Sequence, residues 1–264
     1  MLDDIMIGQY IEKDSMVHRL DPRTKILVIL FFVISIFFLD TFKGYLVLSI
    51  FVLVTILLSK LQIKYLLRSI RPLLFIILFT FGIHLFMTRG GQVLWQWRFL
   101  RIEEHGLRLG SFMALRLVFL VLYTSLLTLT TSPLELTDGL EELLNPFKRF
   151  GLPAHELAMM MTIALRFIPT LLEEAKKIMK AQKARGADFE GGNLIQRAKN
   201  LIPLLVPLFV SAFRRADDLA LAMEARCYRG GENRSRMKIL QLEIKDYLTL
   251  GVGFIYLTAV GVFL

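Results

Sequence analysis

The sequence predicts an all-α integral membrane protein with about five transmembrane helices and a cytoplasmic module of two long helices and a shorter one. Three observations favour this fold class. The 264-residue chain is 55% hydrophobic with a mean hydropathy of +0.56, whereas a soluble domain is roughly 45–50% apolar. Five apolar stretches approach the length of a membrane span. Charged residues concentrate between the fourth and the fifth of them.

The first span is expected at residues 22–39, because Asp21 can cap a helix and Pro22 is tolerated at its first position. Its length corresponds to roughly 27 Å at about 1.5 Å per residue, enough for a bilayer core. The other spans are expected at residues 44–59 (extended by Thr41 and Phe42), 72–87, 109–131 and 247–264.

Residues 132–246 have a different character, with 18 Lys and Arg and 15 Asp and Glu among apolar stretches. The segment Ser132–Glu135 is a capping box that predicts a short helix, which Asn145-Pro146 ends. Two long helices are expected to follow, up to Arg185 and over residues 194–226. The predicted organisation is therefore a membrane domain at 1–131, a cytoplasmic domain at 132–246 and a last transmembrane helix at 247–264.

The two long helices are apolar in one half and charged in the other. The apolar halves, Leu157–Leu172 and Leu201–Phe213, are shorter than the roughly 20 residues of a span. We therefore expect each helix to be half buried against the membrane face or a partner and half in the cytosol, in preference to two extra spans.

The orientation follows from the Lys and Arg residues that flank the spans. With the N-terminus inside, twelve of these cations lie on the inner flanks and five in the outer loops. A multi-pass protein of the cell membrane is predicted, with its N-terminus and the 132–246 domain in the cytoplasm. The net charge of +9 then reflects these flanks, since no basic run is interleaved with aromatic residues as nucleic-acid binding requires.

The sequence lacks the motifs of common catalytic sites: it has no phosphate-binding G-x-x-x-x-G-K-[ST], no H-E-x-x-H and no G-x-S-x-G. One cysteine and four scattered histidines form no metal-ligand pattern, so neither a metal nor a cofactor is expected. Two ionisable residues fall inside spans. For His84 we favour a hydrogen bond to a neighbouring helix, and for Arg116 snorkelling or pairing within the bundle, over a functional role.

The two long helices end in similar segments 41 residues apart, Lys183–Gly186 and Glu224–Cys227. Each alone is explained by an arginine that complements the helix dipole and a C-terminal glycine. The similarity extends backward, however, with opposite charges at matching positions: Glu173-Glu174 corresponds to Arg214-Arg215, and Lys176-Lys177 to Asp217-Asp218. The helices could pair there, although solvated charges on two amphipathic helices explain the pattern equally well.

Two equivalent arginine ends suggest a partner with two equivalent sockets, such as a dimer of ATPases. The apolar halves carry a run of methionines, Met159–Met161. Such a run suits a surface that adapts to varied partners, although a core position is the more common explanation.

These features resemble the T component, the transmembrane coupling subunit of energy-coupling factor (ECF) type ABC transporters for vitamins and transition-metal ions. The resemblance runs along most of the chain. It is carried by Gln9-Tyr10, Ser15, His18–Lys25, Ala164–Pro169 and the two Ala-Arg-Gly-type segments, the second of which has Cys227 in place of glycine.

The resemblance implies a non-catalytic subunit that links two cytoplasmic ABC-type ATPase subunits to a small membrane S component, one or several, that captures the substrate. It implies that the ATPases bind the residues of the two helix ends: Arg185, Arg226, Ala184, Gly186, Ala225 and Cys227. It implies that the S component rests on the apolar halves, for which we select Met159, Met160, Leu165, Pro169, Leu204, Leu205, Pro207 and Leu208.

Two other function classes stay open. A membrane enzyme acting on lipid or isoprenoid head groups would need converging carboxylates or histidines. The adjacent acidic pairs point about 100° apart on a helix, which disfavours it. A stand-alone secondary transporter is disfavoured because the spans are poor in polar residues and show no internal repeat.

Overall fold

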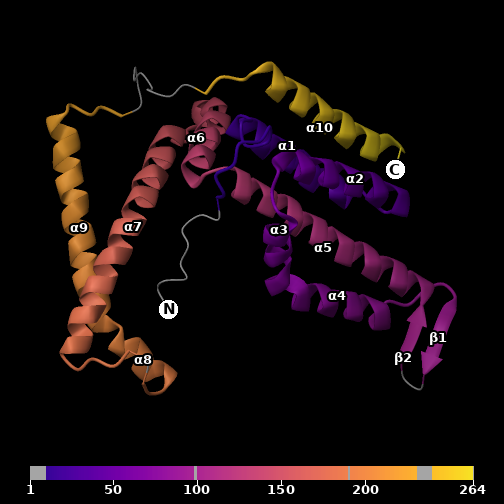
Figure 1. The fold of residues 1–264 in the computed structure, drawn as a ribbon, viewed down its shortest axis with the longest axis horizontal. Coiled ribbons are helices and arrows are strands. Elements are labelled where there is room, and N and C mark those ends of the chain that lie inside the picture. Colours follow the sequence, from indigo (N-terminus) through magenta and orange to yellow (C-terminus); the bar gives the residue numbers. More distant parts are fainter. Residues whose placement is uncertain (1–9, 98–99, 190, 231–239, 264) are drawn as a thin grey trace. The chain divides into compact units, whose positions relative to one another are not determined.

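The computed structural model describes residues 10–97, 100–189, 191–230 and 240–263. The chain divides into two compact units. We call residues 10–139 and 240–263, as far as they are described, the bundle unit. Residues 140–230 form the crossed-helix unit, and the division falls inside helix α6 (Figure 1). Gln9 and three of the twelve inner cations, Arg234, Arg236 and Lys238, lie outside the described residues.

The bundle unit is built from helices of 8 to 27 residues and one hairpin. Its elements are α1 (Pro22–Phe37), α2 (Phe42–Ser59), α3 (Ile63–Ile70), the 3-10 turn η1 (Arg71–Leu73), α4 (Leu74–Met87), β1 (Val93–Trp97), β2 (Leu100–Glu103), α5 (Glu104–Thr130), the first half of α6 (Pro133–Leu144) and α10 (Ile244–Phe263).

Two helices, α1 and α6, begin as the sequence predicts. The Asp21 carboxylate accepts a hydrogen bond from the backbone N–H of Arg23, 2.9 Å away, and caps α1. The capping box before α6 is confirmed, because the Ser132 hydroxyl accepts from the N–H of Glu135 at 3.2 Å and the Glu135 carboxylate accepts from the N–H of Ser132 at 3.4 Å. These side chains satisfy N–H groups that the first turn of a helix leaves unpaired.

The core of the bundle unit lies around α5, which contacts α1, α2, α3 and α4, while α1 also packs along α10. Aromatic rings join these helices: Phe32 stacks on Tyr123 with 4.1 Å between ring centroids, and Phe51 stacks on Tyr256 at 4.9 Å. Stacked rings add specific geometry to the burial of a large apolar surface.

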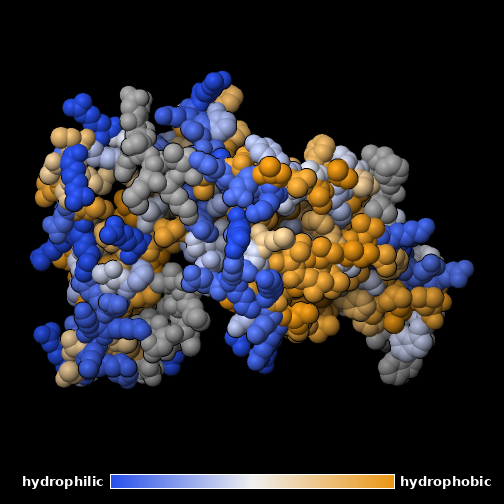
Figure 2. Space-filling model, turned by 45° about the horizontal axis from the view of Figure 1, so that its top comes forward, coloured by the Kyte–Doolittle hydropathy of each residue, from blue (hydrophilic) through white to orange (hydrophobic). Residues whose placement is uncertain are grey.

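The outward faces of the bundle unit are apolar. Phe75 and Met87 on α4 are 76% and 75% exposed, and hydrophobic residues cover a broad surface over the helices of this unit (Figure 2). A broad exposed apolar surface is expected to face lipid or a partner protein. The all-α membrane fold is thereby confirmed.

Among the described residues, four segments are long and apolar enough to cross a membrane: α2, Ile63–Met87, α5 and α7 of the crossed-helix unit. The third expected span is therefore longer than predicted, since α3 and η1 continue into α4. The spans expected at 22–39 and 247–264 correspond to α1, with 16 residues, and α10, with 20. Length and composition would also let α7 cross, so its place at the membrane surface stays a prediction.

The region between α4 and α5 differs from the loop that the sequence suggested. Strands β1 and β2 pair antiparallel, with Trp95 opposite Ile102, and α5 begins at Glu104 rather than near residue 109. A β-branched and aromatic run favours strands, and Gly90 and Gly91 provide positive φ angles before the hairpin.

The crossed-helix unit contains the rest of α6, the 3-10 helix η2 (Asn145–Phe150), α7 (Ala154–Ala184), α8 (Leu194–Asn200) and α9 (Ile202–Ala225). The helix expected over residues 194–226 is wrong in one respect, because it is interrupted at Leu201. Pro203 explains the break: a proline has no N–H to donate and favours the first turn of a new helix.

Candidate functional site

Helices α7 and α9 run in opposite directions and cross (Figure 1). At the crossing, Nη2 of Arg215 donates a hydrogen bond to Oε2 of Glu174 over 3.2 Å, and the Ser211 hydroxyl donates to the other carboxylate oxygen. The hypothesis of opposite charges pairing at the 41-residue offset is thus confirmed for Glu174 and Arg215. The pairing of Lys176-Lys177 with Asp217-Asp218 stays a prediction.

The crossing lies equally far from the two arginine ends. Glu174 precedes Arg185 by eleven residues, and Arg215 precedes Arg226 by eleven residues. At about 1.5 Å per residue, each helix therefore extends roughly 16 Å from the crossing to its arginine. Because the helices are antiparallel, these two equal arms point away from the crossing in opposite senses.

Both arms end in the same hydrogen-bonded cap. After α7, the N–H of Gly186 donates to Lys183 O and that of Ala187 to Gln182 O, each at 3.0 Å. After α9, the N–H of Cys227 donates to Glu224 O at 2.8 Å and that of Tyr228 to Met223 O at 3.0 Å. Each pair of bonds is a Schellman motif, with Arg185 or Arg226 at the C-cap.

The Schellman motif requires a left-handed residue directly after each arginine. Gly186 has φ 87° and Cys227 has φ 55°. Glycine adopts this region without strain, whereas a side chain makes it costly. Cys227 nevertheless preserves the geometry, so the departure from glycine in the second segment changes the energy of the helix end and not its shape.

The two arginines are exposed and available. Arg185 and Arg226 are exposed, as are their neighbours Ala184, Gly186, Ala225 and Cys227. In the part of the chain that the structure describes, neither guanidinium forms an ion pair. A planar guanidinium presented beside small side chains can bind a carboxylate through two parallel hydrogen bonds.

The residues selected on the apolar halves fall into three groups by exposure. Met160, Pro169, Leu205 and Pro207 are exposed, Met159, Leu165 and Leu208 are half-buried, and Leu204 is buried with 8% of its surface exposed. Leu204 therefore belongs to the core of the unit. Pro169 and Pro207 lie inside α7 and α9, as predicted.

Sequence reasoning missed the largest apolar side chains of this surface. Phe209 and Phe213 on α9 are 60% and 69% exposed, and Val206, between Leu205 and Pro207, is 56% exposed. Their spacing of three and four residues places them along one face of the helix. That periodicity was available in the sequence, but it is the same in a buried helix face.

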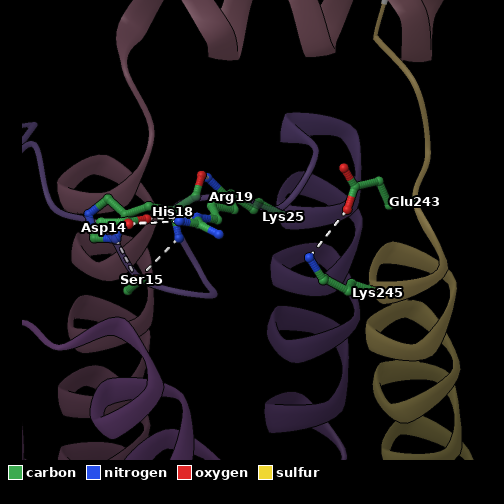
Figure 3. Close-up of polar contacts among 7 residues, drawn as sticks. All are labelled: Asp14, Ser15, His18, Arg19, Lys25, Glu243 and Lys245. Atoms are coloured by element: carbon green, nitrogen blue, oxygen red, sulfur yellow. Dashed lines mark hydrogen bonds and ion pairs between the residues drawn. The ribbon is translucent and has the colours of Figure 1, made fainter.

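A second ordered cluster lies in the bundle unit, in the segment before α1 (Figure 3). The backbone N–H of Ile11 donates to Leu129 O at 3.0 Å, and Lys13 Nζ donates to Lys60 O at 3.0 Å. Lys25 on α1 is buried and donates to His18 O at 3.0 Å and to Thr130 O at 3.1 Å. The segment thus ties together the ends of α1, α2 and α5.

His18 is the centre of this cluster. Its Nε2 lies 3.1 Å from Ile11 O, which can only accept, so Nε2 carries a proton. Its Nδ1 lies 2.6 Å from the Ser15 hydroxyl, which donates in the neutral imidazole. Burial lowers the pKa of the His18 imidazole, reinforced by the charges of Lys25 and Lys13 and opposed by the Ile11 carbonyl and Glu135. The motif His18–Lys25 therefore organises the helix ends.

The ionisable residues inside spans have local partners. His84 Nδ1 lies 3.3 Å from the Thr88 hydroxyl at the end of its own helix, so the expected bond to a neighbouring helix is wrong. Arg116 donates to Leu39 O at 3.4 Å and lies 5.2 Å from the centre of the Phe37 ring. The pairing of Arg116 within the bundle is confirmed.

Comparisons with known proteins cover almost the whole chain. Residues 13–239 match the family model CbiQ, described as cobalt transport protein. Three relatives carry the name energy-coupling factor transporter transmembrane protein EcfT. The relative from Clostridium kluyveri is 58% identical over 94% of this chain and 92% of its own length. The relative from Thermosediminibacter oceani is 60% identical over 92% of this chain and 91% of its own length. The relative from Bacillus subtilis is 49% identical over 100% of this chain and 99% of its own length.

Proposed function

The chain belongs to the CbiQ family of cobalt transport proteins, and from this premise we propose that it is the transmembrane coupling component of an ECF-type ABC transporter. In this function it joins two cytoplasmic ATP-binding cassette subunits to a separate small membrane S component. The S component captures a vitamin or a transition-metal ion, and this chain transmits the ATP-driven change of shape that releases it inside the cell.

The observation that carries this proposal is the repeated helix end on two equal arms. Arg185 and Arg226 have the same C-cap hydrogen bonds and lie at the same distance along the helix from the Glu174–Arg215 crossing. The two equivalent helix ends at Arg185 and Arg226 fit a partner with two equivalent binding grooves, since symmetric partners present the same surface twice. Two ATPase subunits that close on ATP supply such grooves.

The S component is proposed to lie on the apolar surface of the same two helices. The exposed residues that support this are Met160, Pro169, Leu205, Val206, Pro207, Phe209 and Phe213. Exposed aromatic and methionine side chains are enriched at interfaces and contribute much of their binding energy. Met159, Leu165 and Leu208, which are half-buried, would lie at the edge of this contact.

The mechanism follows from the crossing. When the two ATPases approach each other, they displace the two arginine ends in opposite senses, and the helices turn about the Glu174–Arg215 contact. This rotation changes the shape of the apolar surface on the far side of the crossing. The S component, which binds there, must then reorient. The chain itself contributes positioning and force transmission rather than catalysis.

This function requires the crossed-helix unit to lie in the cytoplasm, with the N-terminus on the same side. The excess of Lys and Arg on those flanks supports the orientation. Cys227 is the single cysteine of the chain and is exposed, so this orientation can be tested by labelling without introducing another cysteine. A membrane-impermeant maleimide should label Cys227 in inverted vesicles and not in intact cells.

The proposal is tested by purifying the tagged chain from native membranes in mild detergent and identifying the proteins that accompany it. Two ATP-binding cassette proteins and a small hydrophobic protein are expected, and the last would reveal the substrate class. Several such small proteins would mean a shared module. Isolation of the chain alone, together with an enzymatic or transport activity of its own, would instead favour the membrane enzyme or the secondary transporter.

A further inference from the structure

The bundle unit contains a cavity of about 460 Å³ that the proposed function does not use. Four helices line it, each with one face over one to two turns: residues 25, 28 and 29 of α1, 51, 54, 55 and 58 of α2, 123, 126, 127 and 130 of α5, and 245, 248, 249 and 252 of α10. Side chains spaced by three, four and seven residues share one face of a helix. All four stripes belong to the helix ends on one side of the bundle.

Different residues line the two ends of the cavity and its side. At the inner end lies Phe51, whose ring stacks on Tyr256. At the other end lie Met16, Val17 and Leu20 of the segment that His18 organises. Several side chains of the lateral walls are exposed, Val54 and Leu58 on α2 and Leu248 and Val252 on α10. These residues continue the apolar surface that faces lipid, so the cavity opens toward the bilayer.

Two ammonium groups mark the end nearest the membrane surface. Lys245 lines the cavity, is exposed and lies 3.4 Å from the Glu243 carboxylate (Figure 3). Lys25 lines the same end and uses its ammonium group on the carbonyls of His18 and Thr130. An exposed pair such as Lys245–Glu243 is weak, so the ammonium can turn to another anion at little cost.

We propose that this cavity is a binding site for one phospholipid of the bilayer, with an acyl chain between the four helices and the phosphate against Lys245. An apolar cavity of this size excludes water and leaves its lining without contacts unless a chain fills it. A lysine between transmembrane helix ends is a common partner of lipid phosphates. The open side of the cavity lies on the apolar surface that faces lipid, so an acyl chain can enter it directly from the bilayer.

The test compares cavity-filling variants with controls of the same chemistry. Thr249→Phe fills the cavity from α10. Thr258→Phe makes the same change on the exposed side of that helix and is the control. The two threonines are matched, because the hydroxyl of each donates a hydrogen bond to the carbonyl four residues earlier. Val54→Phe fills the cavity from α2, and Val47→Phe is its control at a similarly exposed site. Because two helices are used, a folding defect in one variant does not remove the test.

Each full-length chain is reconstituted in vesicles of equal parts phosphatidylethanolamine and phosphatidylglycerol, extracted in mild detergent and analysed by native mass spectrometry. We expect one retained phospholipid on the original chain and on both controls, and occupancy about tenfold lower in Thr249→Phe and Val54→Phe, since lost methylene contacts weaken lipid binding steeply. Lys245→Gln should lower retention about fivefold, whereas Lys64→Gln should not.

Equal retention by each filled variant and its control would overturn the proposal. Equal retention by Lys245→Gln and Lys64→Gln would overturn the contact between the lipid phosphate and Lys245. The readout is lipid mass on this chain and does not depend on whether the chain couples ATPases to transport.

Discussion

Glu174 and Arg215 form an ion pair across the antiparallel helices α7 and α9, with 3.2 Å between Oε2 and Nη2. They are 41 positions apart in the sequence, the same offset that relates the two arginine helix ends. The pair therefore lies at an approximate two-fold axis that relates α7 to α9 in the crossed-helix unit. Its position makes it the natural pivot for any change in the crossing angle.

Reversing one charge of this pair should loosen the crossing. In Arg215→Glu two carboxylates would face each other beside Ser211, whereas combining it with Glu174→Arg restores opposite charges. Pulsed electron paramagnetic resonance measures the distribution of distances between spin labels on α7 and α9. This distribution should broaden in the single variant and narrow again in the double variant. Arg214→Glu, whose side chain leaves the helix about 100° away, is the control.

The 41-residue offset was visible in the sequence because the similar helix ends and the opposite charges follow the same spacing. Sequence reasoning could therefore propose both the pairing and the two arginine ends. It could not choose between a contact and two solvated faces, since amphipathic helices carry such charges in either case. Only the crossing geometry decides that Glu174 and Arg215 meet.

Cys227→Gly should stabilise the end of α9. Cys227 holds φ 55°, a conformation that costs a residue with a side chain about 1–2 kcal/mol relative to glycine. We expect the free energy of unfolding to rise by about 1 kcal/mol. Part of the relief of strain is offset, because glycine also raises the conformational entropy of the unfolded chain. Hydrogen exchange of the Cys227 and Tyr228 amides should slow accordingly.

The converse change, Gly186→Ala, introduces a side chain at the left-handed position after α7. A Cβ at Gly186 would meet nothing within 4 Å, so its cost is conformational alone. We expect a loss of about 1 kcal/mol and faster exchange of the Gly186 and Ala187 amides. Unchanged exchange at both helix ends would mean that the left-handed residue carries no strain in this cap.

The segment around His18 should weaken as the solution becomes acidic. The pKa of His18 is held below its ordinary value of 6.5, chiefly by burial. The unfolded state therefore binds a proton first, and stability falls as the pH drops below about 6.5 until the folded-state pKa is passed. Because the ring is partly exposed, solvent screening keeps this loss of stability small.

Thermal unfolding of the chain between about pH 7 and pH 5 measures this effect. His18→Gln lacks the titrating group and should show a smaller change over that range. The pKa of Asp14 is lowered from 3.8 by the Arg19 guanidinium, so its titration falls below this window. An equal pH dependence in His18→Gln would exclude His18 as its source.

The apolar surface of α9 should be needed for the S component and not for the ATPases. Phe209→Ser and Phe213→Ser each remove an exposed aromatic side chain, and interface aromatics often contribute about 2 kcal/mol. We expect the small membrane protein to be lost from the purified complex while both ATPases remain. Phe150→Ser is the control, since Phe150 is exposed on η2 of the same unit.

Most helices were predictable because their signals are local: a capping carboxylate at Asp21, a capping box at Ser132, and apolar runs of membrane length. The hairpin after α4 was missed because a short aromatic run between charges is also typical of a loop. The break at Leu201 was missed because Pro203 can kink a helix or begin one. The exposure of Phe209 depends on which helix face finds a partner, which periodicity does not specify.

Arg185 and Arg226 should be equally important for binding the ATPases. The two arms are of equal length and end in the same cap, so each single change to glutamate should remove one of two equivalent contacts and weaken association about tenfold or more. The double variant should insert normally and retain no ATPase. Arg149→Glu, on the exposed surface of η2, is the control.

Lysine at the same positions separates charge from geometry. Arg185→Lys and Arg226→Lys keep the positive charge but lose the planar fork that binds a carboxylate twice. We therefore expect intermediate ATPase binding and uptake in the lysine variants. Undiminished binding in the double glutamate variant would contradict the two-prong arrangement. A strong defect in only one of the single variants Arg185→Glu and Arg226→Glu would contradict the equivalence of the two helix ends. Two equivalent binding sites on the ATPases must lose the same affinity when either arginine is removed.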